Sequence, residues 1–195
     1  MTIAILAVQG AFAEHAAMLD RLSAEHFEIR QKSDLDRPFD GLILPGGEST
    51  VMNKLLRELE LYEPLKAQIE GGLPVFGTCA GLILLADRVE GGVPCFGGMD
   101  ITARRNAYGR QLGSFRVEER FGEEDGVPMV FIRAPYIVEA GQGVEILART
   151  GGHIVAARQG NRLVTAFHPE LTEDTRVHAR FLEMAAARRK AVKGA

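Results

Sequence analysis

The chain has 195 residues, of which 46% are hydrophobic and 25% are charged, a composition typical of a globular domain and unlike that of disordered or fibrous chains. A net charge of −3 argues against a nucleic-acid-binding surface, and no apolar run is long enough to cross a membrane. With only two cysteines and no basic, signal-like N-terminus, we expect a cytoplasmic protein without disulfides. We expect residues 1–195 to form one domain.

Apolar strands alternate with amphipathic helices in the first half of the chain. The hydrophobic pattern predicts strands at residues 3–8, 27–30 and 41–44 and from Val75, and helices at 14–23, around 55–59, at 63–70 and at 80–86. This alternation is typical of a parallel sheet covered by helices on both faces, which binds its ligands beyond the carboxyl ends of the strands.

From about Gly91 the pattern changes to short strands separated by glycine turns. The strands are expected at 101–105, 112–117, 129–133, 144–148, 154–158 and 163–167, in antiparallel or mixed pairing. A last helix is expected to begin at Thr172 as N-cap, with Glu173 and Asp174 in its first turn. The predicted fold is therefore α/β, with three layers, a mostly parallel open sheet and additional antiparallel or mixed strands in the C-terminal half.

Cys79 lies in the segment Gly77-Thr78-Cys79-Ala80-Gly81, where a buried strand gives way to an apolar helix. The same strand–turn–helix arrangement places the nucleophile of G-x-S-x-G enzymes on an exposed elbow. A helix N-terminus at this position would stabilise a thiolate. The alternative interpretation is a buried cysteine that packs as a small hydrophobic residue.

His168-Pro169-Glu170 follows the last predicted strand. Residues two apart in an extended chain face the same side, and Pro169 restricts the backbone between them, so an imidazole and a carboxylate can lie together here. A thiol nucleophile requires such a base and orienting group. Alone, the segment could equally be a loop histidine beside a surface glutamate. Its position at the carboxyl end of a strand, like that of Cys79, favours the functional interpretation.

The segment Pro45-Gly46-Gly47-Glu48-Ser49 follows another buried strand. Its two glycines permit a close backbone approach, and their N–H groups can act as oxyanion donors. The alternative is a tight turn in which Glu48 or Ser49 caps the next helix. The segment lacks the spacing and the lysine of a phosphate-binding loop.

The remaining histidines and the second cysteine carry no chemical prediction. The four histidines lack metal-ligand spacing, so we expect no metal site and interpret them as structural or surface residues. They are His15, His26, His153 and His178. Cys95 has no predicted base nearby and is assigned no role.

The segments 45–49, 77–81 and 168–170 together resemble the three motifs of class I, triad-type glutamine amidotransferases. Within that class, segments 42–50, 105–111, 131–135 and 167–174 resemble the glutaminase subunits of pyridoxal 5′-phosphate synthases. The similarity extends over nearly the whole chain. It implies the α/β fold of the class I glutamine amidotransferases.

The resemblance also implies a role for each matching residue. Cys79 would be the nucleophile, His168 the acid–base group and Glu170 its orienting carboxylate. The backbone N–H groups of Gly47 and Ala80 would form the oxyanion hole. Glutamine would be held by Gly47, Glu48, Ser49, Arg105, Ile132 and Arg133.

The implied reaction is hydrolysis of L-glutamine to L-glutamate and ammonia through a glutamyl thioester. The ammonia would pass to a separate synthase subunit in a hetero-oligomeric complex that makes pyridoxal 5′-phosphate, and this chain would need no cofactor and bind no nucleic acid or membrane. Two other classes remain open: a non-catalytic interaction module on the same fold, and a cysteine peptidase or stress protein with a related elbow. A glutamate-release assay and a panel of peptide substrates distinguish them.

Overall fold

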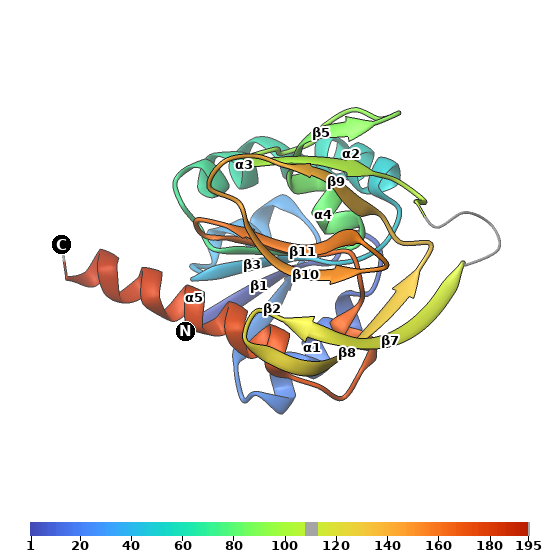
Figure 1. Ribbon diagram of the computed structural model, residues 1–195. Helices are drawn as coiled ribbons and strands as arrows, with labels where there is room; N and C mark the ends of the chain where they lie inside the picture. The colour runs from blue at the N-terminus through green and yellow to red at the C-terminus, as the bar shows by residue number, and fades with distance from the viewer. Residues whose placement is uncertain (108–112, 195) are drawn as a thin grey trace.

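The computed structural model describes residues 1–107 and 113–194, and its centre is a mostly parallel sheet with helices on both faces (Figure 1). Along the sheet the strands follow in the order β2 (Glu25–Ile29), β1 (Thr2–Leu6), β3 (Gly41–Leu44), β4 (Val75–Thr78), β12 (Arg162–Thr165), β11 (His153–Gln159), β9 (Tyr136–Ala140), β6 (Met99–Arg104) and β5 (Ala86–Glu90), and β10 (Glu145–Thr150) pairs with β11. Strands β2 to β12 of this order are parallel, whereas β11 pairs antiparallel with β12, β9 and β10. The predicted fold class is confirmed.

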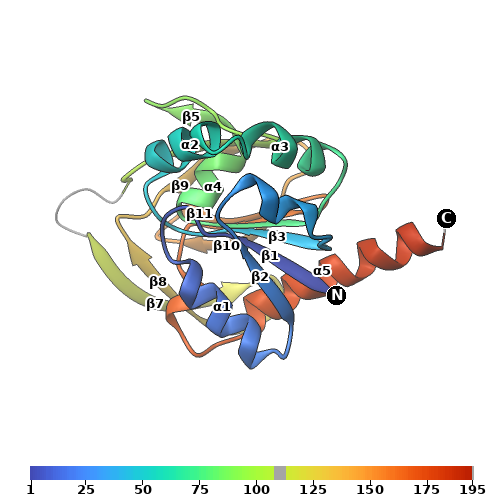
Figure 2. The ribbon, with the colours of Figure 1, turned by 180° about the vertical axis from the view of Figure 1, so that it is seen from behind.

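The helices divide between the two faces of the sheet, as the two opposite views show (Figures 1 and 2). One face carries α1 (Phe12–Arg21) and α5 (Arg176–Lys193), and the other carries α2 (Ser49–Glu58), α3 (Tyr62–Glu70) and α4 (Ala80–Leu85). A separate antiparallel ribbon consists of β7 (Ser114–Phe121) and β8 (Glu124–Ile132). Two short 3₁₀ helices, η1 (Lys32–Asp36) and η2 (Pro169–Leu171), complete the elements.

The central strands are buried because helices cover both of their sides. All residues of β3 and β4 are buried, and four consecutive residues of β1, from Ile3 to Leu6, are completely so. Such uninterrupted apolar runs are typical of parallel strands between two helical layers. They anchor the loops that follow the strands. No helix in the described part of the chain has the length and apolarity needed to span a bilayer.

The structure corrects the prediction for the last helix. Thr172 has an extended backbone, with φ −122° and ψ 176°, and α5 begins only at Arg176. The hydroxyl of Thr172 accepts a hydrogen bond from the backbone N–H of Asp174 (3.2 Å), and the Asp174 carboxylate accepts one from the N–H of Arg176 (2.9 Å). Thr172 therefore stabilises a turn before the helix, and Asp174 binds the N–H of Arg176, the first residue of α5.

Two strands were not predicted, β5 and β9. The apolar run expected as one helix over residues 80–86 ends at Leu85, and β5 begins at Ala86 with mostly exposed side chains. Residues 108–111 of the resemblance and Leu112, the expected start of a strand, lie outside the described residues.

The carboxyl ends of β3, β4 and β12 lie side by side. Leu44 is in register with Gly77, and Thr78 is in register with Thr165. The N–H of Cys79 extends this pairing by donating to the carbonyl of Thr165 (2.8 Å). The loops that follow β3, β4 and β12 are far apart in the sequence but begin at neighbouring strand ends.

Gly81 provides a test of how tightly α4 packs on the sheet. A Cβ at this position would lie 2.1 Å from the carbonyl oxygen of Leu44, so Gly81→Ala has to displace the helix from β3. Alanine favours a helix by about 1 kcal/mol over glycine, but overpacking costs about 1–3 kcal/mol, so we expect a net loss of stability in guanidinium unfolding.

The matched control is Gly71→Ala, at the end of α3. There φ is −70° and the nearest atom to an added Cβ, the carbonyl oxygen of Ala67, lies 3.2 Å away. We expect a change within about 0.5 kcal/mol. Equal stability of the two variants would contradict the close contact between α4 and β3.

Candidate active site

Cys79 occupies a strained turn between β4 and α4. Its backbone has φ +49° and ψ −97°, a region that residues other than glycine seldom adopt. Strain of this kind persists only where the surroundings determine the conformation, and it is frequent at functional sites. The hydrogen bond from Cys79 N–H to Thr165 on one side and the start of α4 on the other hold the turn. The elbow predicted from the sequence is therefore present.

His168 and Glu170 form a buried pair directly after β12. Nδ1 of His168 lies 2.7 Å from Oε1 of Glu170, and the two side chains are 8% and 0% exposed. The backbone N–H of His168 donates to the carbonyl of Val130 in β8 (2.8 Å), which fixes the start of η2. The expected proximity is correct but its expected cause is wrong: Pro169 opens a 3₁₀ turn, and the two side chains meet across that turn rather than along an extended chain.

The surroundings of His168 favour its charged form. Burial alone would lower its pKa, but hydrogen bonds to Cys79 and Glu170, together with the negative charges of both groups, raise the pKa to about 10. At neutral pH the imidazole is therefore protonated. Since Nδ1 is bonded to Glu170, Nε2 is the nitrogen available to the sulfur of Cys79.

The loop after β3 passes directly over these groups. A Cβ on Gly46 would lie 2.3 Å from Cε1 of His168, and one on Gly47 would lie 2.4 Å from Oε1 of Gln9. Only glycine allows the loop to lie this close to the imidazole of His168 and to the end of β1. The side-chain oxygen of Gln9 also accepts a hydrogen bond from the N–H of Glu48 (2.8 Å). The backbone of this loop is thus held against the reacting groups.

Glu48 has two structural contacts at this edge. Its carboxylate accepts from the N–H of Val51 (2.9 Å) and caps α2, as one of the sequence alternatives anticipated. The same carboxylate forms an ion pair with Arg105 at 2.8 Å. The cap and the ion pair tie α2 to the chain that leaves β6.

A cleft of about 380 Å³ connects these loops. The predicted residues that line it are Gly47, Glu48, Ser49, Cys79, Arg105, Ile132, Arg133 and His168. Glu170 lies behind His168, and Ala80 is the first residue of α4, where the backbone N–H has no partner within the helix. Most of the predicted set therefore surrounds one cavity.

Other residues of the cleft were given no binding role. They include Ile83, Asn106, Pro135 and Leu171. Leu171 follows the His-Pro-Glu segment directly and Asn106 follows Arg105, so proximity in sequence was the only available indication. Ile83 lies one helical turn after Cys79, where an apolar residue in an apolar run has no distinguishing feature.

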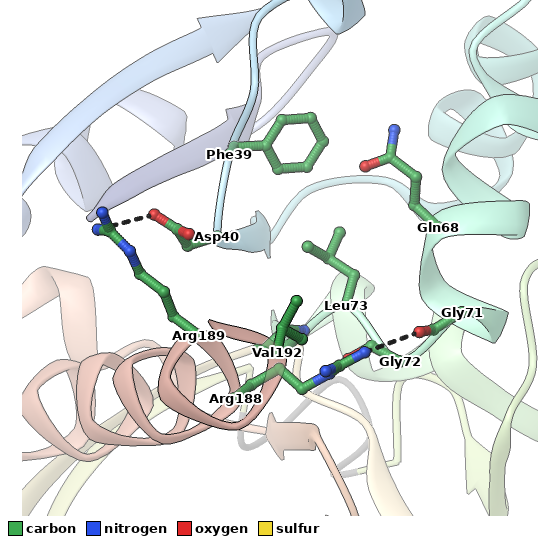
Figure 3. Close-up of a pocket in the computed structure, with 10 residues that line it drawn as sticks. Phe39, Asp40, Gln68, Gly71, Gly72, Leu73, Arg188, Arg189 and Val192 are labelled. Carbon is green, nitrogen blue, oxygen red and sulfur yellow. Dashed lines mark hydrogen bonds and ion pairs between the residues drawn. The ribbon is translucent and has the colours of Figure 1, made fainter. Parts of the chain in front are cut away.

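A second hollow of about 390 Å³ lies at the opposite end of the sheet (Figure 3). Asp40 and Pro74, which line it, precede β3 and β4 and so belong to the amino ends of these strands. Arg189 pairs there with Asp40 at 3.4 Å (Figure 3). Its lining contains no cysteine or histidine, in contrast to the cleft that holds Cys79 and His168. Among the described residues, no cluster of His, Cys, Asp and Glu side chains is arranged to hold a metal ion.

The fold and the cleft together define a class I glutamine amidotransferase. A solved structure described as a glutamine amidotransferase superimposes with a TM-score of 0.89 at 44% identity, covering 94% of this chain and 98% of that one. A glutamine amidotransferase of Thermotoga maritima shares the fold, with a TM-score of 0.61 and 14% identity over 99% of this chain and 93% of that one.

Sequence comparison assigns the chain to a narrower family within this class. It belongs to the SNO glutamine amidotransferase family, whose model matches residues 5–187. Proteins named pyridoxal 5′-phosphate synthase subunit PdxT are similar to it over most of its length. That of Methanocorpusculum labreanum is 60% identical, covering 95% of this chain and 98% of its own, and that of Bifidobacterium longum is 53% identical, covering 92% and 98%. The family expected from the three motifs is confirmed.

The raised pKa of His168 predicts how stability depends on pH. The folded-state pKa of about 10 exceeds the ordinary value of 6.5, so the stabilisation is complete below pH 6.5 and is lost as the pH rises toward 10. The difference in unfolding free energy between the wild-type protein and His168→Gln should therefore decrease over this interval. Chemical denaturation of both proteins at a series of pH values measures it. A constant difference would show that His168 is not held as an imidazolium.

Proposed function

We propose that this chain is the glutaminase subunit of a pyridoxal 5′-phosphate synthase and hydrolyses L-glutamine to L-glutamate and ammonia. The observation that carries this proposal is the alignment of Cys79, His168 and Glu170 at the edge of a cleft of about 380 Å³. The family and the names of its relatives support the choice of substrate and pathway.

The geometry supports a covalent mechanism. The Cys79 thiolate attacks the side-chain carbonyl carbon of glutamine, and the imidazolium of His168 gives its proton to the departing nitrogen. Ammonia leaves and a glutamyl thioester remains. The neutral imidazole then takes a proton from water, which hydrolyses the thioester to glutamate. Glu170, at 2.7 Å from Nδ1, holds the imidazole in the required tautomer and stabilises its charge.

The oxyanion that forms during attack needs donors near Cys79. We assign this role to the backbone N–H groups of Gly47, in the loop over His168, and Ala80, at the start of α4. Preorganised N–H donors stabilise developing charge strongly because they need no reorganisation during the reaction. The loop around Gly47 is fixed by the bond between Gln9 and Glu48, which also determines how its peptides are oriented.

Polar groups around the cleft suit the amino-acid end of glutamine. Arg105 and Arg133 are positioned to bind the α-carboxylate, since arginine matches carboxylate geometry, and Glu48 and Ser49 can accept or donate at the amino group. The apolar stem of the substrate would lie against Ile132. These assignments follow the family motifs and the positions of the side chains in the cleft.

We propose further that residues 1–195 are one glutaminase domain, which the continuous buried core from β1 to α5 supports. The chain would act in the cytoplasm, without a cofactor of its own. Its protein partner would be the synthase subunit, which takes the ammonia. The relatives named as synthase subunits support this assignment.

Replacing the nucleophile tests the reaction directly. Cys79→Ala should abolish glutamate release because no thioester can form, while a small residue replaces a small one and leaves the fold intact. The complex of this variant with the synthase subunit should still make pyridoxal 5′-phosphate from ammonium salts. Glutamate release above the buffer control in Cys79→Ala would refute the nucleophile assignment.

Arg105 tests glutamine recognition. Arg105→Met should raise KM for glutamine by about 10- to 100-fold and change kcat little, because a hydrogen bond to a charged group is worth about 1.5–3 kcal/mol. Arg104→Met is the control, because the neighbouring Arg104 bonds to Glu90 and Tyr136 outside the cleft. Steady-state glutamate release by the complex measures both. Equal KM values for the two variants would remove Arg105 from the binding site.

A further inference from the structure

Two buried histidines belong to α1 and α5, the helices that cover one face of the sheet (Figure 2). Nδ1 of His15, on α1, lies 2.9 Å from Nε2 of His178, on α5. Nε2 of His15 lies 3.1 Å from the hydroxyl of Thr78 and 3.6 Å from Oε1 of Glu170. A continuous polar chain therefore runs from α5 through α1 to the carboxylate of the triad and to the residue before Cys79.

The positions of the protons on the two histidines follow from the groups at the ends of this row of polar side chains. Nδ1 of His178 is buried and has no hydrogen-bond partner among the described residues. A buried N–H without a partner is costly, so the proton of His178 belongs on Nε2, from which it is donated to Nδ1 of His15. The proton of His15 is then on Nε2, directed toward Thr78 and Glu170. The opposite arrangement would turn a nitrogen lone pair toward the carboxylate.

Both histidines are neutral. Burial, followed by the charges of His178 and His168, holds the pKa of His15 well below its ordinary value, and burial lowers that of His178 to about 4. This matters because a charged His15 would compete with His168 for Glu170. A neutral His15 instead presents an N–H dipole without a second positive charge.

Glu170 has few donors of its own. Oε1 accepts from His168, but Oε2 is buried without a partner in the described part of the chain, and the side chain is inaccessible to solvent. A buried carboxylate oxygen without a hydrogen-bond donor is costly, so a nearby N–H group contributes to holding the side chain in place. The Nε2 of His15 at 3.6 Å from Oε1 is too distant for a hydrogen bond, but the dipole of its N–H still attracts the carboxylate oxygen.

We infer that His15, oriented by His178, is a positioning residue that holds the Glu170 carboxylate directed at His168. Removing the N–H of His15 leaves Glu170 less able to hold the imidazolium, so the chemical step slows while glutamine binding is unaffected. This inference rests on the proposed glutaminase activity and adds to it two residues that lie outside the cleft.

The test compares three substitutions in the complex with the synthase subunit. His15→Phe keeps the ring and its edge contact with Phe76 but removes both nitrogens. It should lower kcat by about 10- to 100-fold, the effect typical of residues that support a reacting group, and leave KM for glutamine within about twofold. His15→Gln, whose amide can again donate toward Glu170, should recover most of the loss. His178→Phe should give a smaller loss, because His15 remains but its tautomer is no longer fixed.

Phe181→Leu is the matched control for packing. Phe181 is buried on the same helix as His178 and also contacts Phe76, with ring centroids 5.6 Å apart, but it has no polar atom. It should lower the unfolding midpoint without a comparable loss of kcat. If His15→Phe does not fold, His178→Phe decides: kcat within twofold of wild type overturns the inference, and a lower kcat at constant KM supports it.

A second readout is independent of glutamine and of the partner. The rate at which iodoacetamide modifies Cys79 at pH 7 reports the reactivity of its sulfur beside His168, and Cys95, whose pKa burial raises to about 11, stays unreactive. Modification should slow in His15→Phe and not in Phe181→Leu. Equal rates in wild type and His15→Phe, or equal losses of kcat in His15→Phe and Phe181→Leu, would overturn the role of His15. Absence of glutaminase activity in the wild-type complex would instead refute the proposed function.

Discussion

The pairing of β4 with β12 is the constraint on which the rest of the site depends. These strands are far apart in the sequence, yet their parallel register, extended by the bond from Cys79 N–H to Thr165, places Cys79 and His168 at adjacent strand ends. Neither neighbouring turn can shift independently, because α4 packs against Leu44 and His168 is bonded to β8. The strained conformation of Cys79 therefore persists, since relaxing it would break sheet pairing and helix packing together.

The sheet and the reacting groups could be predicted from the sequence because they leave local patterns. Apolar residues with a glycine within or a few positions after the run identify β1, β3 and β4, and the residues that follow strands of a parallel sheet share one edge. The predicted limits of the strand at 41–44 agree with β3. Cys79, His168 and the 45–49 loop were therefore assigned to one edge without any knowledge of their distances.

The remaining features depend on contacts that the sequence pattern does not contain. The start of α5 was misplaced because Thr172, Glu173 and Asp174 resemble a helix N-terminus, whereas η2 turns the chain first. Strand β5 was missed because its exposed residues follow an apolar helix without a turn signal. His15 was interpreted as structural or superficial because its partners, His178 and Glu170, lie more than 150 residues away in the sequence.

Burial of two histidines between α1, α5 and the sheet costs free energy unless their ring nitrogens form hydrogen bonds there. Phe76 contacts both histidine rings and also Phe181, so an apolar residue at either histidine position would pack there with a smaller desolvation cost. The layer that stabilises the sheet thus includes a polar path ending at Glu170. The same helices that bury β1 and β4 also carry the polar groups next to Glu170. We therefore expect a change in the packing of α1 or α5 to affect His168 and Cys79 by moving the Glu170 carboxylate, and not by altering the cleft.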